Sequence, residues 1–299
     1  MIAYRRFAKR FGAQVAVTGL TLDVARGEVV ALLGPNGSGK TTSIKAAAGL
    51  VRPTSGDVLI GEPARPASEA AARRACSFLP QKVSFPNSLT AVEVLEFYCA
   101  LRGRPAARAA DALSIASLNG ASRRAVGTYS GGMTQRLGLA VALMAEAPLL
   151  LLDEPTAALD PDGLRAFYEL IERRRTTGQT VLFSSHQMGD VERLADRFAV
   201  LVAGRLVATF TGRELGAKLA DRGVMKVTLD RPLPAVFEAV QRLAPAAAWA
   251  GEALVVPGPA SARPAVLDAI LGAGGIVTGL TAEEGRLDEF YRELVEGEA

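Results

Sequence analysis

The sequence is poor in the residues that build metal centres and disulfide frameworks. It contains one histidine, His186, and two cysteines, Cys76 and Cys99, among 299 residues. The cysteines are far apart, lack C-x-x-C spacing and each lies in an apolar run. We therefore expect no metal-ligand cluster, and we expect both thiols to be buried and reduced.

The sequence also lacks a long uninterrupted hydrophobic segment. The longest apolar stretch, about 137–152, is broken by Glu146 and Pro148 and is shorter than the roughly 20 residues of a membrane-spanning helix. No signal peptide is visible at the start. A membrane role is therefore expected to come through a partner protein.

Neither sign of charge dominates the chain. The 34 basic and 31 acidic residues leave a net charge of +3. A dedicated nucleic-acid binder usually carries a basic patch or stripe. No nucleic-acid partner is therefore expected.

What the sequence does contain is an alternation of short apolar runs and helical patterns. The runs cover 28–33, 76–80, 149–153 and 180–185. This alternation predicts an α/β fold with a mostly parallel sheet. Between 86 and 146 the pattern is largely helical, with a capping box at Thr90 and Glu93 that opens a helix to about residue 102, and a mostly apolar helix over 133–146. The insertion predicts a helical lobe at about 86–146 beside the α/β core.

A further helix is expected over 163–177. It ends in Arg173, Arg174 and Arg175 before Gly178, and basic residues suit the negative end of a helix. An ordinary solvated helix end is the main interpretation of these arginines, and an anion site is the alternative.

The pattern changes near residue 215, which predicts two domains, 1–215 and 216–299. In the second we expect strands at 225–229, 247–250, 253–256 and 275–280, and helices at 234–243, 263–272 and 286–296. This βαββαβ order predicts a small ferredoxin-like α+β domain. It carries no chemical motif, so we expect a role in regulation or dimer contact.

The strongest functional motif is a phosphate-binding loop between a strand and a helix. It consists of Gly34, Pro35, Asn36, Gly37, Ser38, Gly39, Lys40 and Thr41, which match G-x-x-x-x-G-K-[ST], and Thr42 follows within the same nucleotide site. Glycines let backbone N–H groups point at phosphate oxygens, and the helix start adds its positive dipole end. Lys40 is expected to contact the β- and γ-phosphates, and Thr41 to bind Mg²⁺.

A second motif follows the apolar run 149–152. The run predicts a buried strand that delivers Asp153 to its carboxyl end, where ligands of open α/β sheets bind. Asp153 is expected to hold Mg²⁺, directly or through water. Glu154 is expected to orient and deprotonate an attacking water.

A third motif, Ser130, Gly131 and Gly132, opens the 133–146 helix. A hydroxyl, free N–H groups and a helix N-terminus together make a second anion site. One compact nucleotide does not need two phosphate cradles on the same chain. The second cradle is therefore expected to serve a nucleotide bound by another subunit.

In these motifs and their order, roughly residues 1–215 resemble the ABC ATPase family. The resemblance implies that Ser130, Gly131 and Gly132 are the family signature. It also implies that Gln81 contacts Mg²⁺ and the attacking water. His186 is similar to the switch histidine that contacts the γ-phosphate.

The resemblance extends to the adenine site and the dimer interface. Phe11 precedes a strand region that we expect at Val17–Val24, and it resembles the aromatic residue that stacks on adenine, with Tyr4 as the competing candidate. Ala157, Ala158, Leu159 and Asp160 look like the D-loop that crosses between subunits.

Three positions depart from the family pattern. Met133 stands where glutamine is most familiar, Tyr129 replaces leucine, and Ala157 replaces the first serine of the D-loop. Because Lys40 and the catalytic residues are in place, we expect tuned rather than absent hydrolysis.

The resemblance implies an ATPase that uses ATP and Mg²⁺ and pairs with a second copy of itself. It would drive a substrate through an integral membrane permease at the cytoplasmic face of the inner (plasma) membrane. One alternative is a soluble ABC ATPase acting on nucleic acid or ribosomes, but such proteins typically carry two cassettes, coiled-coil arms or zinc modules. Another is an unrelated P-loop kinase or GTPase, which leaves Ser130, Gly131 and Gly132 unexplained.

The small C-terminal domain resembles that of export-type systems for drugs, lipids or polysaccharides. Residues 129–139 and 287–294 also look like the ATPase subunit of the copper-site maturation transporter for nitrous oxide reductase. The cargo is selected by the membrane subunit, so the sequence leaves both interpretations open.

Overall fold

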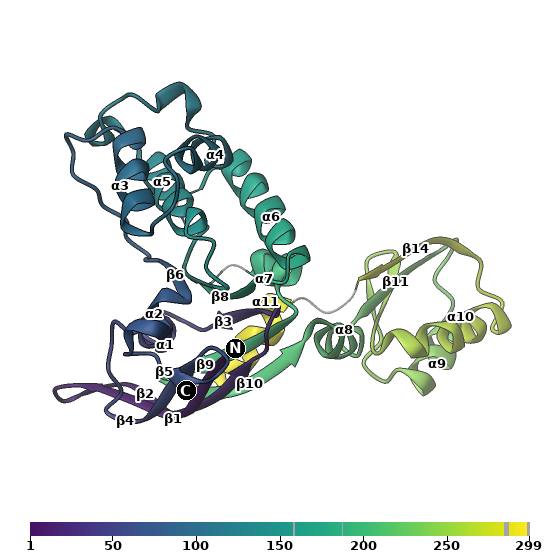
Figure 1. The fold of residues 1–299 in the computed structure, drawn as a ribbon. Coiled ribbons are helices and arrows are strands. Elements are labelled where there is room, and N and C mark those ends of the chain that lie inside the picture. The colour runs from purple at the N-terminus through teal and green to yellow at the C-terminus, as the bar shows by residue number, and fades with distance from the viewer. Residues whose placement is uncertain (158, 187, 284–286, 298–299) are drawn as a thin grey trace. The chain divides into compact units, whose positions relative to one another are not determined.

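The chain forms two compact units, Met1–Phe210 and Thr211–Gly297, drawn in Figure 1. This computed structural model describes residues 1–299 except 158, 187, 284–286 and 298–299. The sequence placed the division near residue 215. It falls earlier because helix α8 (Gly212–Ala220), which begins with its own capping box at Thr211 and Glu214, belongs to the second unit.

A six-stranded sheet with the order β10-β9-β3-β8-β7-β6 forms the centre of the first unit. Its strands are β3 (Val29–Leu33), β6 (Cys76–Leu79), β7 (Leu149–Asp153), β8 (Thr180–Ser185), β9 (Arg197–Val202) and β10 (Arg205–Thr211). The four pairings from β9 through β3, β8 and β7 to β6 are parallel, as the alternation of strands and helices predicts. Every residue of β3 and β7 is buried, which explains their continuous apolar runs.

A second, antiparallel sheet has the order β2-β1-β4-β5. It consists of β1 (Ile2–Phe11), β2 (Gln14–Val24), β4 (Ser55–Ile60) and β5 (Arg65–Pro66). The sequence had indicated only a strand region near 17–24. Helix α1 (Lys40–Ala47) packs against strands of both sheets, and Ile44 joins Tyr4 and Leu32 in one buried cluster. This core fixes the start of α1 relative to both sheets.

The expected helical lobe consists of α3 (Ala91–Leu101), α4 (Arg108–Ile115) and α5 (Gly131–Met144), with the 3-10 turns η1 (Asn119–Ala121) and η2 (Val126–Thr128) between them. Its core includes Leu95, Leu113 and Leu137. The capping box is present, because the Thr90 hydroxyl accepts from the Glu93 N–H and the Glu93 carboxylate accepts from the Thr90 N–H.

Two helices begin earlier than the sequence predicted. Helix α5 starts at Gly131 rather than 133 because Ser130 is its N-cap. Helix α6 (Pro161–Thr176) starts before residue 163 because Asp160 caps it and Pro161 occupies the first turn. The remaining helices of this unit are α2 (Ala70–Arg74) and α7 (Met188–Leu194).

The second unit contains a four-stranded antiparallel sheet with the order β12-β13-β11-β14. Its elements after α8 are β11 (Val224–Leu229), α9 (Pro234–Leu243), β12 (Ala248–Ala250), β13 (Ala253–Pro257), η3 (Ala260–Ala262), α10 (Arg263–Gly272), β14 (Val277–Glu283) and α11 (Leu287–Glu296). The prediction of a strand over 275–280 was wrong at both ends, because β14 pairs with β11 as far as Glu283. Residue 286, the predicted start of the last helix, lies outside the described residues.

The expectation that both cysteines are buried is met by the structure. Cys76 and Cys99 are both free and buried. Among the described residues, no helix is both long enough and apolar enough to cross a membrane.

The capping box of α3 offers a test of the lobe. Thr90→Ala removes a cap worth about 1 kcal/mol, so deuterium exchange of the first-turn amides of α3 should become about fivefold faster. Ser68→Ala, at an exposed serine outside the lobe, is the control and should leave this exchange unchanged. Equal exchange in both variants would mean that the capping box does not hold the helix.

Candidate nucleotide site

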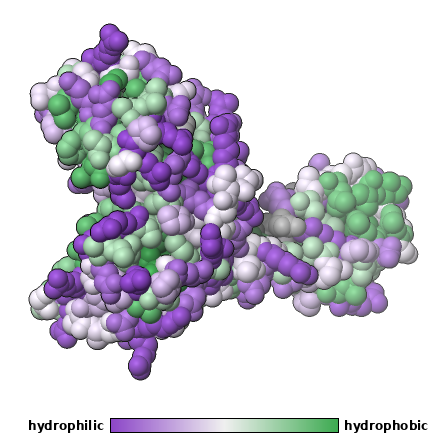
Figure 2. Space-filling model, viewed as in Figure 1, coloured by the Kyte–Doolittle hydropathy of each residue, from purple (hydrophilic) through white to green (hydrophobic). Residues whose placement is uncertain are grey.

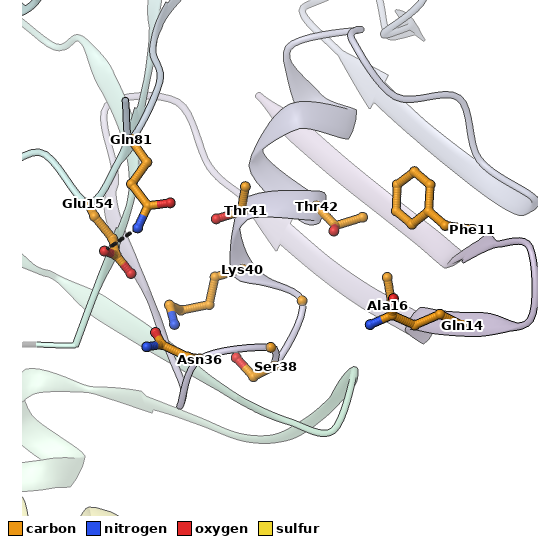
Figure 3. A pocket seen from close by; sticks show the side chains of 12 residues that line it. Phe11, Gln14, Ala16, Asn36, Ser38, Lys40, Thr41, Thr42, Gln81 and Glu154 are labelled. Atoms are coloured by element: carbon orange, nitrogen blue, oxygen red, sulfur yellow. Dashed lines mark hydrogen bonds between the residues drawn. The ribbon is translucent and has the colours of Figure 1, made fainter. Parts of the chain in front are cut away.

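A cavity of about 450 Å³ opens at the carboxyl edge of the parallel sheet (Figure 3). It is lined by Phe11, Gln14, Ala16, Asn36, Gly37, Ser38, Gly39, Lys40, Thr41, Thr42, Gln81 and Glu154. The loop after β3, the segment after β6 and the end of β7 thus meet the end of β1 from the other sheet. Most of the residues predicted from separate motifs are therefore brought together.

The glycines of the loop after β3 are required by close packing and by backbone conformation. A Cβ atom at Gly34 would lie 2.2 Å from Ser38 Oγ and 2.3 Å from the Leu201 carbonyl oxygen. Gly39 has a φ of 99°, and a Cβ atom there would lie 2.7 Å from the Ala16 carbonyl oxygen. The loop can therefore form only with glycine at these positions.

Lys40 is held at the wall of the cavity. Its Nζ donates to the carbonyl oxygens of Gly34 at 2.7 Å and Pro35 at 3.1 Å, and the residue is only 4% exposed. Burial lowers the pKa of Lys40, while the nearby carboxylates of Glu154 and Asp153 act to raise it. The loop therefore carries a partly desolvated positive charge beside the start of α1. No side chain caps this helix start, so its first backbone N–H groups lack a side-chain acceptor.

Asp153 is completely buried at the end of β7. Its Oδ1 accepts from Ser184 Oγ at 2.7 Å and from Thr41 Oγ1 at 3.0 Å, whereas its buried Oδ2 has no hydrogen-bond partner among the described residues. Burial raises the pKa of Asp153, and the two hydroxyl donors oppose this shift. An unpartnered carboxylate oxygen beside a threonine hydroxyl fits Mg²⁺, which prefers hard oxygen ligands and binds through few protein groups.

Glu154 is placed by three other polar residues. Its Oε2 accepts from Gln81 Nε2 at 2.8 Å, and its Oε1 lies 3.6 Å from His186 Nδ1 (the first contact is dashed in Figure 3). Its backbone N–H donates to Ser184 Oγ at 2.9 Å. Its φ of 48° is left-handed, a conformation that costs a non-glycine residue about 1–2 kcal/mol. The predicted residues Glu154, Gln81 and His186 therefore form one cluster.

Ser184 was missed by the sequence analysis. Its hydroxyl donates to Asp153 and accepts from the Glu154 N–H, so it connects the expected metal ligand with the expected base. The one available signal was that the apolar run 180–185 ends in two serines at the carboxyl edge of the sheet.

The structure separates the two candidates for adenine stacking. Phe11 lines the cavity and is 51% exposed. Tyr4 is fully buried, its hydroxyl donates to the Ser43 carbonyl oxygen at 2.9 Å, and burial raises its pKa. Lys9 lies over the Phe11 ring, 4.9 Å from its centre, and steadies it by a cation–π contact. Only Phe11 of the two can meet a base, and Gln14 and Ala16 beside it were not anticipated.

The motif Ser130, Gly131 and Gly132 does not line this cavity. The Ser130 hydroxyl accepts from the Met133 N–H at 3.3 Å as the N-cap of α5. A Cβ atom at Gly131 would meet no described atom within 4 Å, so packing inside this chain does not require glycine there. Of the four residues compared with a D-loop, Ala158 lies outside the described residues.

Comparison with known proteins identifies the family. A family model described as ABC transporter matches residues 17–157. The linearmycin resistance ATP-binding protein LnrL of Bacillus subtilis is 32% identical over 248 residues, which cover 82% of this chain and 80% of that protein. The chain belongs to the ABC transporter family. It is the ATP-binding subunit of such a transporter and hydrolyses ATP.

Other relatives of this ABC ATPase agree with that assignment. The Nod factor export ATP-binding protein I of Burkholderia orbicola is 39% identical, with 69% of each chain covered. The dimeric ATP-binding cassette MJ0796, solved in a post-hydrolysis state with ADP and Pi, has a TM-score of 0.67 and 26% identity. That match covers 71% of this chain and 99% of the cassette, and it shows that the first unit has the P-loop fold of ABC ATPases.

Ser184 gives a test of how this ABC ATPase positions Glu154. Ser184→Ala should lower kcat roughly tenfold to a hundredfold, because Glu154 loses the hydroxyl that holds its backbone, while the KM for ATP changes little. The control is Thr180→Val at the opposite end of β8, whose hydroxyl accepts from the Gly27 N–H. Steady-state kinetics that show an unchanged kcat for Ser184→Ala would exclude a positioning role.

Proposed function

We propose that two copies of this ABC ATPase close around two ATP molecules. Each nucleotide is held by the phosphate loop of one copy and by Ser130, Gly131 and Gly132 of the other. The observation that carries this proposal is that the second anion cradle does not line the nucleotide cavity of its own chain. Gly131 supports the proposal, because a side chain at this position would contact no described residue of its own chain. Glycine is therefore not required there by packing within the chain. The dimeric cassette MJ0796 offers a precedent in a related protein.

Each side of the cavity has a distinct role in this proposal. Phe11 stacks on the adenine, while the backbone of residues 34–39, Lys40 and Thr42 contact the phosphates. Thr41, Gln81 and Asp153 would hold Mg²⁺, which neutralises phosphate charge when it is bound. The unpartnered Oδ2 of Asp153 supports this placement.

Hydrolysis depends on the cluster around Glu154. The Glu154 carboxylate orients a water for in-line attack on the γ-phosphorus and takes its proton, and the bond to the β-phosphate oxygen breaks. Gln81 and His186, which lie beside the two carboxylate oxygens, keep that group and the water in place. Catalysis is then mainly positioning and charge stabilisation.

Glu154→Gln tests the assignment of the base. It keeps the shape of the side chain but cannot accept the proton, so turnover should fall about a hundredfold or more while ATP still binds. With ATP and Mg²⁺ the variant should accumulate as a dimer in size-exclusion chromatography with light scattering, and with ADP it should not. Hydrolysis at the wild-type rate would mean that another group is the base.

A groove on the first unit supports docking of a permease. This cavity of about 310 Å³ is lined by Ser77, Phe78, Leu79, Pro80, Lys82, Val83, Ser84, Phe85, Tyr98, Leu101, Arg102, Gly138, Val141 and Ala142. It lies between the segment that carries Gln81 and helices α3 and α5. Leu101 is 66% exposed at this groove and Phe97 on the same helix is 61% exposed, and Figure 2 shows apolar side chains on the lobe. A permease segment seated here would sense movement of Gln81.

The relatives favour export as the direction of transport. Their names include linearmycin resistance, Nod factor export and, in Mycobacterium tuberculosis, doxorubicin resistance. We infer that the permease exports its substrate and that this ABC ATPase acts at the cytoplasmic face of the inner membrane. The relatives named above do not favour copper-site maturation, and export is the function we propose.

We infer that the second unit, Thr211–Gly297, is the ferredoxin-like regulatory or dimer-contact domain that the sequence predicts over about 216–299. Support comes from its βαββαβ order and from the sheet order β12-β13-β11-β14, in which β13 lies between β11 and β12. Its apolar core includes Val227, Val240 and Ile270.

The docking groove can be tested with the permease complex. Leu101→Ser removes an exposed apolar contact, so the permease should bind roughly tenfold more weakly and stimulate ATP hydrolysis less. The basal ATPase rate of the isolated subunit should stay at the wild-type value. Leu50→Ser is the control, because Leu50 is similarly exposed, at 61%, and does not line the groove. Equal stimulation of both variants would place the permease elsewhere.

A further inference from the structure

A second polar cavity of the first unit lies between α6 and the end of α4. It has a volume of about 410 Å³. It is lined by Ser114, Ser117, Ala166, Glu169, Leu170, Arg173, Arg174 and Thr177. Five of these residues belong to α6 and Thr177 is its C-cap, and they recur at helical spacing. One face of that helix therefore forms a wall, and the two serines from the other side complete it. No residue of the nucleotide cavity takes part.

Arg174 differs from the arginines on either side of it. Arg173 pairs with Glu169 at 3.8 Å, and Arg175 pairs with Glu172 at 3.7 Å and also with Asp196. Within the described part of the chain, the half-buried guanidinium of Arg174 makes no ion pair and no hydrogen bond. Burial lowers the pKa of Arg174, because its charge is partly removed from water.

The carboxylate of Glu146, which attracts Arg174, already forms ion pairs with other arginines. Glu146 forms ion pairs with Arg104 at 3.4 Å and with Arg108 at 3.0 Å. Arg174 is attracted by Glu146 and repelled by Arg108. Two other guanidinium groups therefore occupy the Glu146 carboxylate, and Arg174 makes no ion pair of its own within the described residues. A helix end of the ordinary solvated kind does not have this arrangement.

The cavity combines charge with hydroxyl donors. Arg173 and Arg174 supply planar guanidinium groups, and the exposed Ser114 and Ser117 supply hydroxyls. Guanidinium groups with neighbouring hydroxyls match the geometry of phosphate oxygens. We propose that this cavity binds a phosphate-type oxyanion through Arg174, with Arg173, Ser114 and Ser117 as further donors.

Such a ligand would connect the two parts of the first unit. Ser114 and Ser117 lie at the end of α4 in the helical lobe, whereas Arg173 and Arg174 lie at the end of α6 beside the sheet. A bound oxyanion therefore bridges lobe and core and resists their relative movement. The ligand has two possible sources, free phosphate or the phosphate monoester of a headgroup or metabolite. The proposal does not depend on the composite ATP site.

The test uses the full-length chain with its nucleotide cavity filled by a saturating non-hydrolysable ATP analogue and Mg²⁺. Inorganic phosphate is titrated at constant ionic strength against chloride, and Tm is recorded. Wild type should show a saturable rise in Tm, and Arg174→Gln should need roughly tenfold more phosphate. Arg165→Gln is the matched control, because Arg165 lies on the same helix, pairs with Asp162 and is outside the cavity.

A second variant and a second ligand complete the test. The variant keeps the test informative if Arg174→Gln fails to fold, and the ligand distinguishes free phosphate from a phosphate monoester. Ser114→Ala changes an exposed hydroxyl and should weaken the phosphate response by about fivefold without affecting folding. Glycerol 3-phosphate replaces phosphate in a parallel titration, and the compound with the lower midpoint identifies the source. The proposal is overturned if neither compound gives a saturable response, if acetate acts as well as phosphate, or if Arg174→Gln and Ser114→Ala both behave like wild type.

Discussion

The parallel register of β3, β7 and β8 is the constraint on which the nucleotide site depends. Leu33 is level with Ser185, and Asp153 is level with Ser184, so the phosphate loop, the acidic pair and the serine leave the sheet at one edge. A slip of one residue between β7 and β8 would turn Ser184 to the other face and break its hydrogen bonds to Asp153 and Glu154. Burial of all of β3 and β7 makes such a slip costly.

The same edge concentrates groups that oppose stability. Three ionisable side chains are buried there, those of Lys40, Asp153 and Glu154. Asp153 Oδ2 has no hydrogen-bond partner among the described residues, and Glu154 has a left-handed backbone. These features cost free energy in the protein alone and are offset by the apolar core around α1 and the sheets. A triphosphate with Mg²⁺ would complement them, so the site is arranged for its ligand rather than for stability.

Local sequence patterns were enough to predict much of this fold. The phosphate loop, the buried strands, the capping box of α3 and the helices α9 and α10 of the second unit each follow from residues close together in the chain. The antiparallel sheet was largely missed, because β1 carries four arginines and lysines and is recognisable as a strand only through its pairing with β2 and β4. Ser184 was missed because its role arises from the register between two strands. An anion site at Arg173, Arg174 and Arg175 was only the alternative interpretation of the sequence, which could not single out Arg174. Its lack of an ion pair arises only when α4, α6 and the loop after α5 come together.

The account depends on the assignment of the two anion cradles to different nucleotides. Its most direct test mixes a Lys40→Ala chain with a Ser130→Arg chain, both in a Glu154→Gln background, and measures trapped labelled ATP per mixed dimer. In a head-to-tail dimer both defects fall in one site and the other site is intact. The account predicts about one trapped ATP per mixed dimer and almost none for either variant alone. No trapped ATP in the mixture would contradict it, because the two cradles would then belong to the same chain's nucleotide.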